Sequence, residues 1–227
     1  MKKTSETRNR RERLLETAQQ LMRAKGYAAT TIDEICAAAG VTKGAFFHYF
    51  ADKQDLGKAT LEGFMVAQQR KVQKSALALA PDADPLKRVY GYVDFAIKLS
   101  RDPSSRHGCL LGNFAQELSD THHEIRDLCA QHFSQWAQVL RRDLEAAKTR
   151  HAPRAKFDTA SLADHFIAVF EGALIMGKAK QDMRVVEQSL RHFRNYLQSL
   201  FEKTRPLTRI GAGSPKPRRR TTTSPKT

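Results

Sequence analysis

Several features that mark other classes of protein are scarce or missing in this sequence of 227 residues. Its three cysteines, Cys36, Cys109 and Cys129, are an odd number without tight spacing, which argues against a disulfide scaffold and suits a reducing compartment. No apolar run approaches the ~18 to 20 residues that a membrane-spanning helix needs. The charged N-terminal segment also lacks the apolar stretch of a secretion signal. We therefore expect a cytoplasmic protein without membrane association.

The common sequence signatures of enzymes are also missing. There is no Gly-rich phosphate loop, no nucleophile elbow and no HExxH pair. Histidines and cysteines recur between residues 107 and 132, but Cys129-x-x-His132 supplies only two ligands and no zinc-finger spacing. We expect no enzymatic activity, no cofactor and no metal ion.

Positive charge is abundant but unevenly placed. The formal net charge is +15, and the tail 204–227 carries seven basic residues and no acidic one in a Pro/Ser/Thr-rich context. Such a segment cannot bury a core, so we expect a disordered basic tail. It can add non-specific affinity for DNA or simply keep the chain soluble. Charge alone establishes neither nucleic-acid binding nor specificity.

The rest of the chain has the periodicity of helices, with no alternating run bounded by hairpin turns. In 8–25, apolar residues recur at three- and four-residue intervals and form one stripe: Leu14, Leu15, Ala18, Leu21 and Met22. Further helices are expected at 32–39, 43–50, from 53 towards 79, and at about 85–101, 109–119, 121–149, 158–180 and 183–203. The sequence predicts an all-α fold with a head (1–50), a larger helical body (51–203) and the tail (204–227).

The segment 30–56 predicts a helix-turn-helix. Thr31 and Glu34 form a capping box at the start of one short helix, and Thr42 caps the next. Gly40 supplies the left-handed conformation that the tight turn needs. Apolar residues on both helices are expected to form a small shared core that the first helix of the chain covers: Ile32, Ile35, Cys36, Val41, Phe46 or Phe47, and Phe50.

This stretch resembles the signature of the TetR/AcrR family of transcriptional regulators. The matching pattern is Gly-Tyr-x-x-Thr-Thr, then Ile-x-x-Ile-x-x-x-Ala-Gly-Val-Thr-Lys-Gly-x-x-x-x-Tyr-Phe, within about residues 8–58. The resemblance implies an N-terminal three-helix, helix-turn-helix head on a C-terminal ligand-binding and dimerisation bundle. It further implies a homodimeric repressor that binds a palindromic operator in double-stranded DNA and is released by a small-molecule effector.

The resemblance also implies roles for individual head residues. The threonines are expected at phosphate oxygens, and the start of the helix at 43 is expected at base edges in the major groove. His48 and Tyr49 resemble the family's phosphate-clamping pair, and Phe47 stands where the family often has tyrosine. The expected DNA-binding residues are Thr31, Thr42, Lys43, Gly44, Ala45, Phe47, His48, Tyr49 and Lys53.

Dimerisation is expected through the last two helices, which carry broad apolar faces. Leu162, Phe166, Val169, Phe170, Ala173 and Leu174 line one face, and Val186, Leu190, Phe193, Leu197 and Leu200 line the other. Small residues are expected to permit close helix crossing: Ala168, Gly172, Ala173 and Gly177. Burial of these faces within one protomer is the alternative.

The effector pocket is expected among the central helices, around residues 107–136. Aromatic walls beside polar groups suit a small, mostly apolar ligand. The candidate lining residues are Tyr92, Phe95, Cys109, Asn113, Phe114, Gln116, His132, Phe133, Trp136 and Phe170. Two alternatives stay open: Cys109, at a helix start that can lower a thiol pKa, senses oxidants or electrophiles, or the protein binds DNA without any small-molecule ligand.

Overall fold

The computed structural model describes residues 2–74 and 83–202. Within these ranges the chain forms nine α-helices, one short 3-10 helix and no strand, as an all-α fold requires. The expected tail at 204–227 and the last part of the expected fourth helix lie outside the described residues. The elements are α1 (Lys2–Lys25), α2 (Ile32–Ala39), α3 (Lys43–Tyr49), α4 (Lys53–Lys74), α5 (Pro85–Ser100), η1 (Pro103–His107), α6 (Leu110–Leu118), α7 (His123–His151), α8 (Thr159–Lys180) and α9 (Arg184–Glu202).

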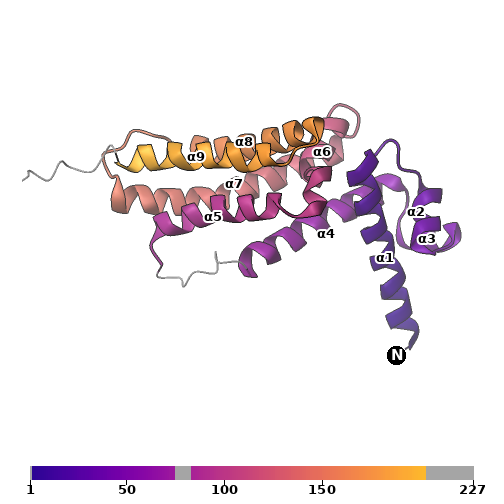
Figure 1. The fold of residues 1–227 in the computed structure, drawn as a ribbon. Helices are drawn as coiled ribbons and strands as arrows, with labels where there is room; N and C mark the ends of the chain where they lie inside the picture. The colour runs from indigo at the N-terminus through magenta and orange to yellow at the C-terminus, as the bar shows by residue number, and fades with distance from the viewer. Residues whose placement is uncertain (1, 75–82, 203–227) are drawn as a thin grey trace, which may run out of the picture.

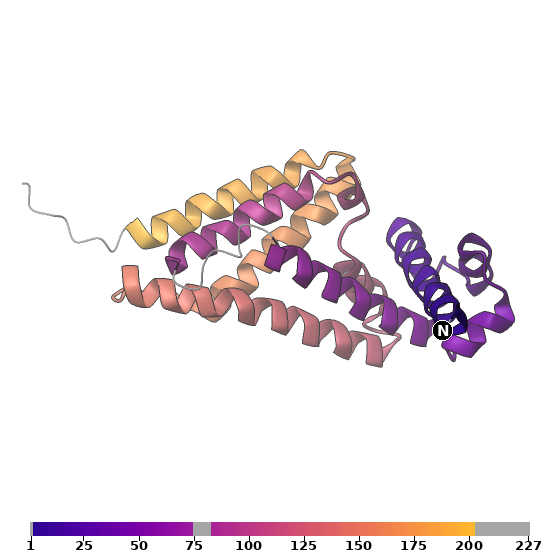
Figure 2. The same ribbon diagram turned by 90° about the horizontal axis from the view of Figure 1, so that it is seen from below.

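The molecule is elongated, with α1, α2 and α3 gathered at one end (Figure 1). Helices α5, α7, α8 and α9 lie lengthwise against one another and form the body. Helix α4 runs from the head into the body, and Figure 2 shows it between the two. Helix α6 lies where the body meets the head, so it is in a position to contact both.

Local sequence signals explain the geometry of the head. Thr31 and Glu34 form the expected reciprocal capping box, and Gly40 adopts the left-handed conformation at φ 61°. Thr42 caps α3 by accepting a hydrogen bond from the Ala45 amide at 3.2 Å. The turn between α2 and α3 is therefore set by local chemistry.

Two apolar cores hold the protein together. The first joins α1, α2, α3 and the start of α4 to α6 and the first turns of α7, through buried residues such as Phe46, Phe114 and Ile125. The second joins α5, the later part of α7, α8 and α9. Cys109 and Phe133 pack against both cores. The head therefore shares its core with the body beyond residue 50.

Helix α8 corrects one expectation about hydrophobic runs. By length and composition it is apolar enough to cross a membrane, whereas the sequence pattern indicated no such segment. Its Phe166, Phe170 and Leu174 are buried in the second core. We interpret α8 as the central core helix of the body.

Candidate DNA-binding and effector sites

Helix α3 presents a narrow exposed strip backed by buried aromatics. Phe46 and Phe50, one turn apart, are 0% and 2% exposed and fix the helix to the first core. The opposite side exposes Lys43, Gly44, Phe47 and His48, with Phe47 51% exposed. This resolves the choice between Phe46 and Phe47, since only Phe46 belongs to the core. An exposed helix face of this kind suits insertion into a major groove.

The other predicted DNA-binding residues have contacts within the protein. Thr31 and Thr42 are exposed but act as helix caps. Ala45 and Tyr49 are half-buried against the first core, which leaves them less accessible than Lys43 or His48.

The two lysines of the predicted interface differ. The Lys43 ammonium lies 2.9 Å from Asp33 Oδ1 in an exposed ion pair that solvent screens. The Lys53 ammonium lies 4.3 Å from the centre of the Tyr27 ring and donates to the Ala28 carbonyl at 3.3 Å. Burial lowers the Lys53 pKa. Lys53 therefore has a structural role at the base of the head.

Helix α6 grips the head through a carboxylate that the sequence analysis missed. Glu117 accepts hydrogen bonds from the backbone amides of Tyr27, at 2.8 Å, and Ala28, at 2.7 Å. Gly26, at φ 93°, allows this approach, because a Cβ there would lie 3.1 Å from Glu117 Oε2. The turn that ends α1 is thus bound to α6 by charge-assisted hydrogen bonds.

A second contact joins α1 to the segment that precedes α6. Arg23 donates to the carbonyls of Ser104, at 2.9 Å, and Gly108, at 2.8 Å. Burial lowers the pKa of this guanidinium. Gly108 directly precedes Cys109, so Arg23 holds the backbone at the edge of the predicted effector region. Nothing in the local pattern around Arg23 indicates a partner 81 and 85 residues away.

Cys109 does not have the environment that its position in the sequence suggested. It is the N-cap residue of α6 but makes no side-chain capping bond. Burial and the nearby Glu171 carboxylate raise the thiol pKa well above its usual value. The expectation of a lowered pKa is therefore wrong, because loss of solvation outweighs the helix terminus.

The predicted pocket residues separate into several environments. Gln116 is exposed and bonds to the Gly112 carbonyl of its own helix, so it does not line a buried pocket. Phe114 belongs to the first core and meets the Tyr27 ring edge-on. Asn113 donates to the His107 carbonyl at 3.0 Å.

The remaining candidates lie deeper in the body. Trp136 packs against Phe170 and Phe166, with ring centroids 5.8 and 6.2 Å apart. Tyr92 packs against the second core, where burial raises its pKa to about 12, and Phe95 is half-buried. Phe133 bridges the two cores, and both ring nitrogens of His132 are buried without a hydrogen-bond partner.

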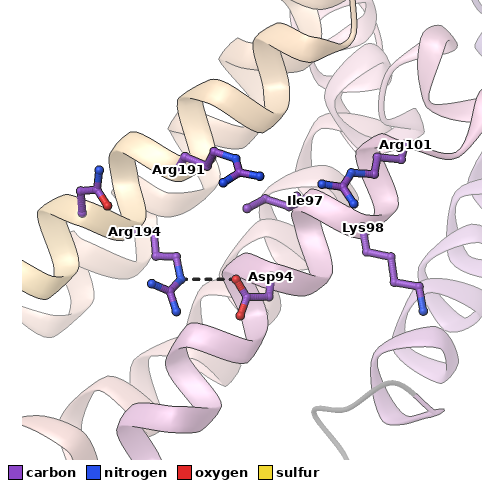
Figure 3. A pocket seen from close by; sticks show the side chains of 7 residues that line it. Asp94, Ile97, Lys98, Arg101, Arg191 and Arg194 are labelled. Carbon is purple, nitrogen blue, oxygen red and sulfur yellow. Dashed lines mark ion pairs between the residues drawn. The ribbon is translucent and has the colours of Figure 1, made fainter.

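A surface groove of about 690 Å³ lies elsewhere, between α5 and α9 (Figure 3). Arg101 and Arg191 both bond to Glu187, at 2.9 and 2.7 Å, and lower its pKa to about 2. Arg194 lies 3.4 Å from Asp94. The pairs of Arg101 with Glu187 and of Arg194 with Asp94 link the end of α5 and α5 itself to α9, whereas the pair of Arg191 with Glu187 lies within α9. We interpret the groove as a surface feature held by these ion pairs. Its lining is Asp94, Ile97, Lys98, Arg101, Arg191, Arg194 and Asn195.

The face of α8 and α9 corrects the dimer prediction in detail. Most of the apolar residues expected at a dimer interface are buried within the protomer instead: Leu162, Phe166, Phe170, Ala173, Leu174, Val186, Leu190, Phe193 and Leu197. Gly177 serves the turn between the helices, where a Cβ would lie 3.1 Å from Met183 Sδ. Apolar surface nevertheless remains on this face, since Ile175, Met176 and Tyr196 are exposed.

Among the described residues, no group of three or more potential metal ligands comes together.

Comparison with known proteins agrees with both halves of this architecture. Residues 14–60 match the family model described as bacterial regulatory proteins of the tetR family, and residues 85–193 match that of the tetracyclin repressor-like C-terminal domain. The chain is 27% identical over 198 residues to the HTH-type transcriptional repressor DhaR of Mycobacterium sp. (strain GP1), covering 87% of this chain and 93% of that protein. It is 31% identical over 162 residues to the transcriptional regulator AcuR of Cereibacter sphaeroides, covering 70% and 71%.

A solved TetR transcriptional regulator from Chloroflexus aurantiacus has the same fold, with a TM-score of 0.75 and 26% identity over 87% of this chain and 97% of that one. The matches extend across the helix-turn-helix head and the helical body alike. This chain therefore belongs to the TetR family of transcriptional regulators.

Proposed function

We propose that the protein is a homodimeric repressor whose two α3 helices read a roughly palindromic operator, and that a small-molecule effector entering the body releases it. The observation that carries the proposal is the exposed strip of Lys43, Gly44, Phe47 and His48, held rigidly by Phe46 and Phe50 beneath it. None of these four residues contributes to the core, so the strip is free to contact a partner.

The strip has the chemistry of a groove reader. Lys43 reaches a guanine edge or a phosphate once it leaves its exposed pair with Asp33. Gly44 leaves open space for the DNA backbone, since no heavy atom lies within 4 Å of a Cβ built there. Phe47 suits apolar contact with a thymine methyl group.

A dimer gives this reader its spacing. Two recognition helices must enter successive major grooves ~34 to 36 Å apart, which makes the half-sites symmetric. The exposed apolar residues Ile175, Met176 and Tyr196 support an interface on α8 and α9. A groove of about 520 Å³ on the same face supports it as well.

Helix α6 supplies a second route from the effector to the head, beside α4. One part of α6 lies at Cys109 and Gly112, and the other holds the head through Glu117. An effector that favours another position of α6 or α4 changes the spacing of the two heads and lowers operator affinity.

The experiment has two stages. Genome-wide mapping of bound sites identifies the operator, and salt titration on that fragment then compares the full chain with Lys43→Ala and His48→Ala. Each lost phosphate contact lowers the slope of log K against log salt by about 0.9. Arg126→Ala is the control, because Arg126 is exposed on the body and pairs with Asp127.

We expect weaker operator binding in the two head variants and unchanged binding in the control. Equal binding by all four proteins contradicts the assignment of α3. If no small molecule changes the affinity for the operator, the result favours the alternative that the protein binds DNA without an effector. The raised pKa of Cys109 keeps its thiol protonated, which disfavours the oxidant-sensing alternative.

A further inference from the structure

Two polar side chains in the body, Glu171 and His132, have buried atoms without a hydrogen-bond partner. Oε1 of Glu171 is buried without a hydrogen-bond partner, although part of the residue reaches the surface. Both ring nitrogens of His132 are buried and unpartnered as well. Each such atom has lost its hydrogen bonds to water without gaining one in the protein, which destabilises the folded state. An apolar side chain at the same position would avoid this cost. Groups of this kind call for a partner that the chain itself does not contain.

The two side chains belong to the same part of the interior. Helices α7 and α8 run antiparallel (Figure 1) and are joined where Trp136 packs against Phe166 and Phe170. His132 lies one helical turn before Trp136, and Glu171 directly follows Phe170. Both residues therefore lie near the contact of Trp136 with Phe170, on the side that faces the head.

Helix α6 closes this region from a third side. The Cys109 thiol is hydrogen-bonded to the Glu171 carboxylate. Gly112 lies directly against Oε2 of Glu171, where any Cβ would collide. One carboxylate oxygen thus faces α6, and the other is left for a further partner.

We propose that this site, defined by Glu171, His132 and Trp136, binds a small organic cation: an amine on an aromatic or aliphatic body, with Glu171 as its counter-charge. This deepens the proposed function by naming the chemical class of the effector, and it rests on that function. An ammonium group donates up to three hydrogen bonds, which match Oε1 of Glu171 and an acceptor nitrogen of His132. The aromatic rings beside the site favour a cation over a neutral group.

Other ligand classes satisfy the site less well. A carboxylate or phosphate brings a like charge to Glu171 in a poorly solvated interior. A hydrocarbon leaves all three polar atoms unpartnered. Burial raises the Glu171 pKa to about 7, as expected for a carboxyl group without a cation from the chain itself.

The single tryptophan of the chain makes the test direct. Trp136 is the only tryptophan in the sequence, so intrinsic tryptophan fluorescence reports on this site. The purified full chain is titrated with 2-phenylethylamine, with its neutral analogue 2-phenylethanol, and with the anion 3-phenylpropionate. The same titrations are repeated on Glu171→Gln and on Glu62→Gln, a control at an exposed glutamate of α4.

We expect a saturable fluorescence change with the amine near 1 mM, as suits a fragment-sized ligand. The amine should bind at least about tenfold more tightly than the alcohol, and the anion should not bind. Glu171→Gln should abolish the preference for the amine, whereas Glu62→Gln should keep it. Because the glutamine side chain has nearly the same shape as glutamate, the variant is expected to fold, and circular dichroism checks this.

Equal binding of amine and alcohol, a preference that survives in Glu171→Gln, or no saturable response to the amine each overturns the proposal. If the amine gives no saturable response, ordered water is the hydrogen-bond partner of these atoms. None of these titrations contains DNA. A negative result therefore overturns the cation site without affecting the proposal that the protein binds an operator.

Discussion

The Glu117 carboxylate accepts hydrogen bonds from two backbone amides of the head, and removing these bonds should change the exchange of those two amide hydrogens specifically. Replacing Glu117 with glutamine keeps the length of the side chain but exchanges one accepting oxygen for an NH₂ group. Of the two amides that it now serves, Tyr27 and Ala28, one loses its acceptor and faces another donor. The other keeps a bond that no longer has a charged partner.

The size of the effect follows from these two bonds. A hydrogen bond to a charged group contributes roughly 1.5–3 kcal/mol, and the partial exposure of this site places the total loss at about 2 kcal/mol. That corresponds to a melting temperature about 4–8 °C lower for a protein of this size. If the turn opens locally, the exchange rates of the two amide hydrogens rise about thirtyfold.

Hydrogen–deuterium exchange read at residues 26–31 measures this directly. The control is Glu124→Gln, because the exposed Glu124 carboxylate contacts side chains, Lys58 at 2.6 Å and Gln54 at 3.3 Å, and no backbone amide of the head. We expect the Tyr27 and Ala28 amides to exchange faster in Glu117→Gln and at the original rate in the control. Unchanged exchange in Glu117→Gln would refute the reasoning.

Three further predictions concern stability. Phe46→Ala should lower the free energy of unfolding by about 3–5 kcal/mol and Phe47→Ala by less than about 0.5 kcal/mol in urea denaturation, because only Phe46 is buried; similar losses would contradict the assigned orientation of α3. Gly40→Ala should cost about 1 kcal/mol by the same assay, since alanine is strained at φ 61°, and an unchanged midpoint argues against that turn. For Glu171, whose pKa is raised to about 7, the folded state keeps a proton that the unfolded state releases near 4.5. Stability should therefore fall as pH rises between these values, and Glu171→Gln should lack this fall; Cys109 stays protonated throughout.

The head was predictable because its structure is dictated locally. Thr31 with Glu34, Gly40 and Thr42 each act within a few residues, and the structure contains every one of these caps and turns. The periodicity likewise located the helices of the body to within a few residues. In the head, the start of α1 was located less well, because this helix begins at Lys2 rather than near residue 8.

Sequence patterns could not decide which apolar face meets which partner. Phe166 and Leu190 have the spacing of an exposed dimer face, yet both are buried within the protomer, because α5 and α7 cover the same sides of α8 and α9. Periodicity shows that a face is apolar and does not say what covers it.

The sequence by itself determined the all-α fold and the helix-turn-helix with its caps, since these depend on interactions between near neighbours. Only the tertiary structure decided the links of Glu117 and Arg23 between head and body, the burial of Phe46 rather than Phe47, the high thiol pKa of Cys109 and the unpartnered oxygen of Glu171. Each of these joins groups far apart in the chain. Their chemistry is set by burial and by partners that no local pattern specifies.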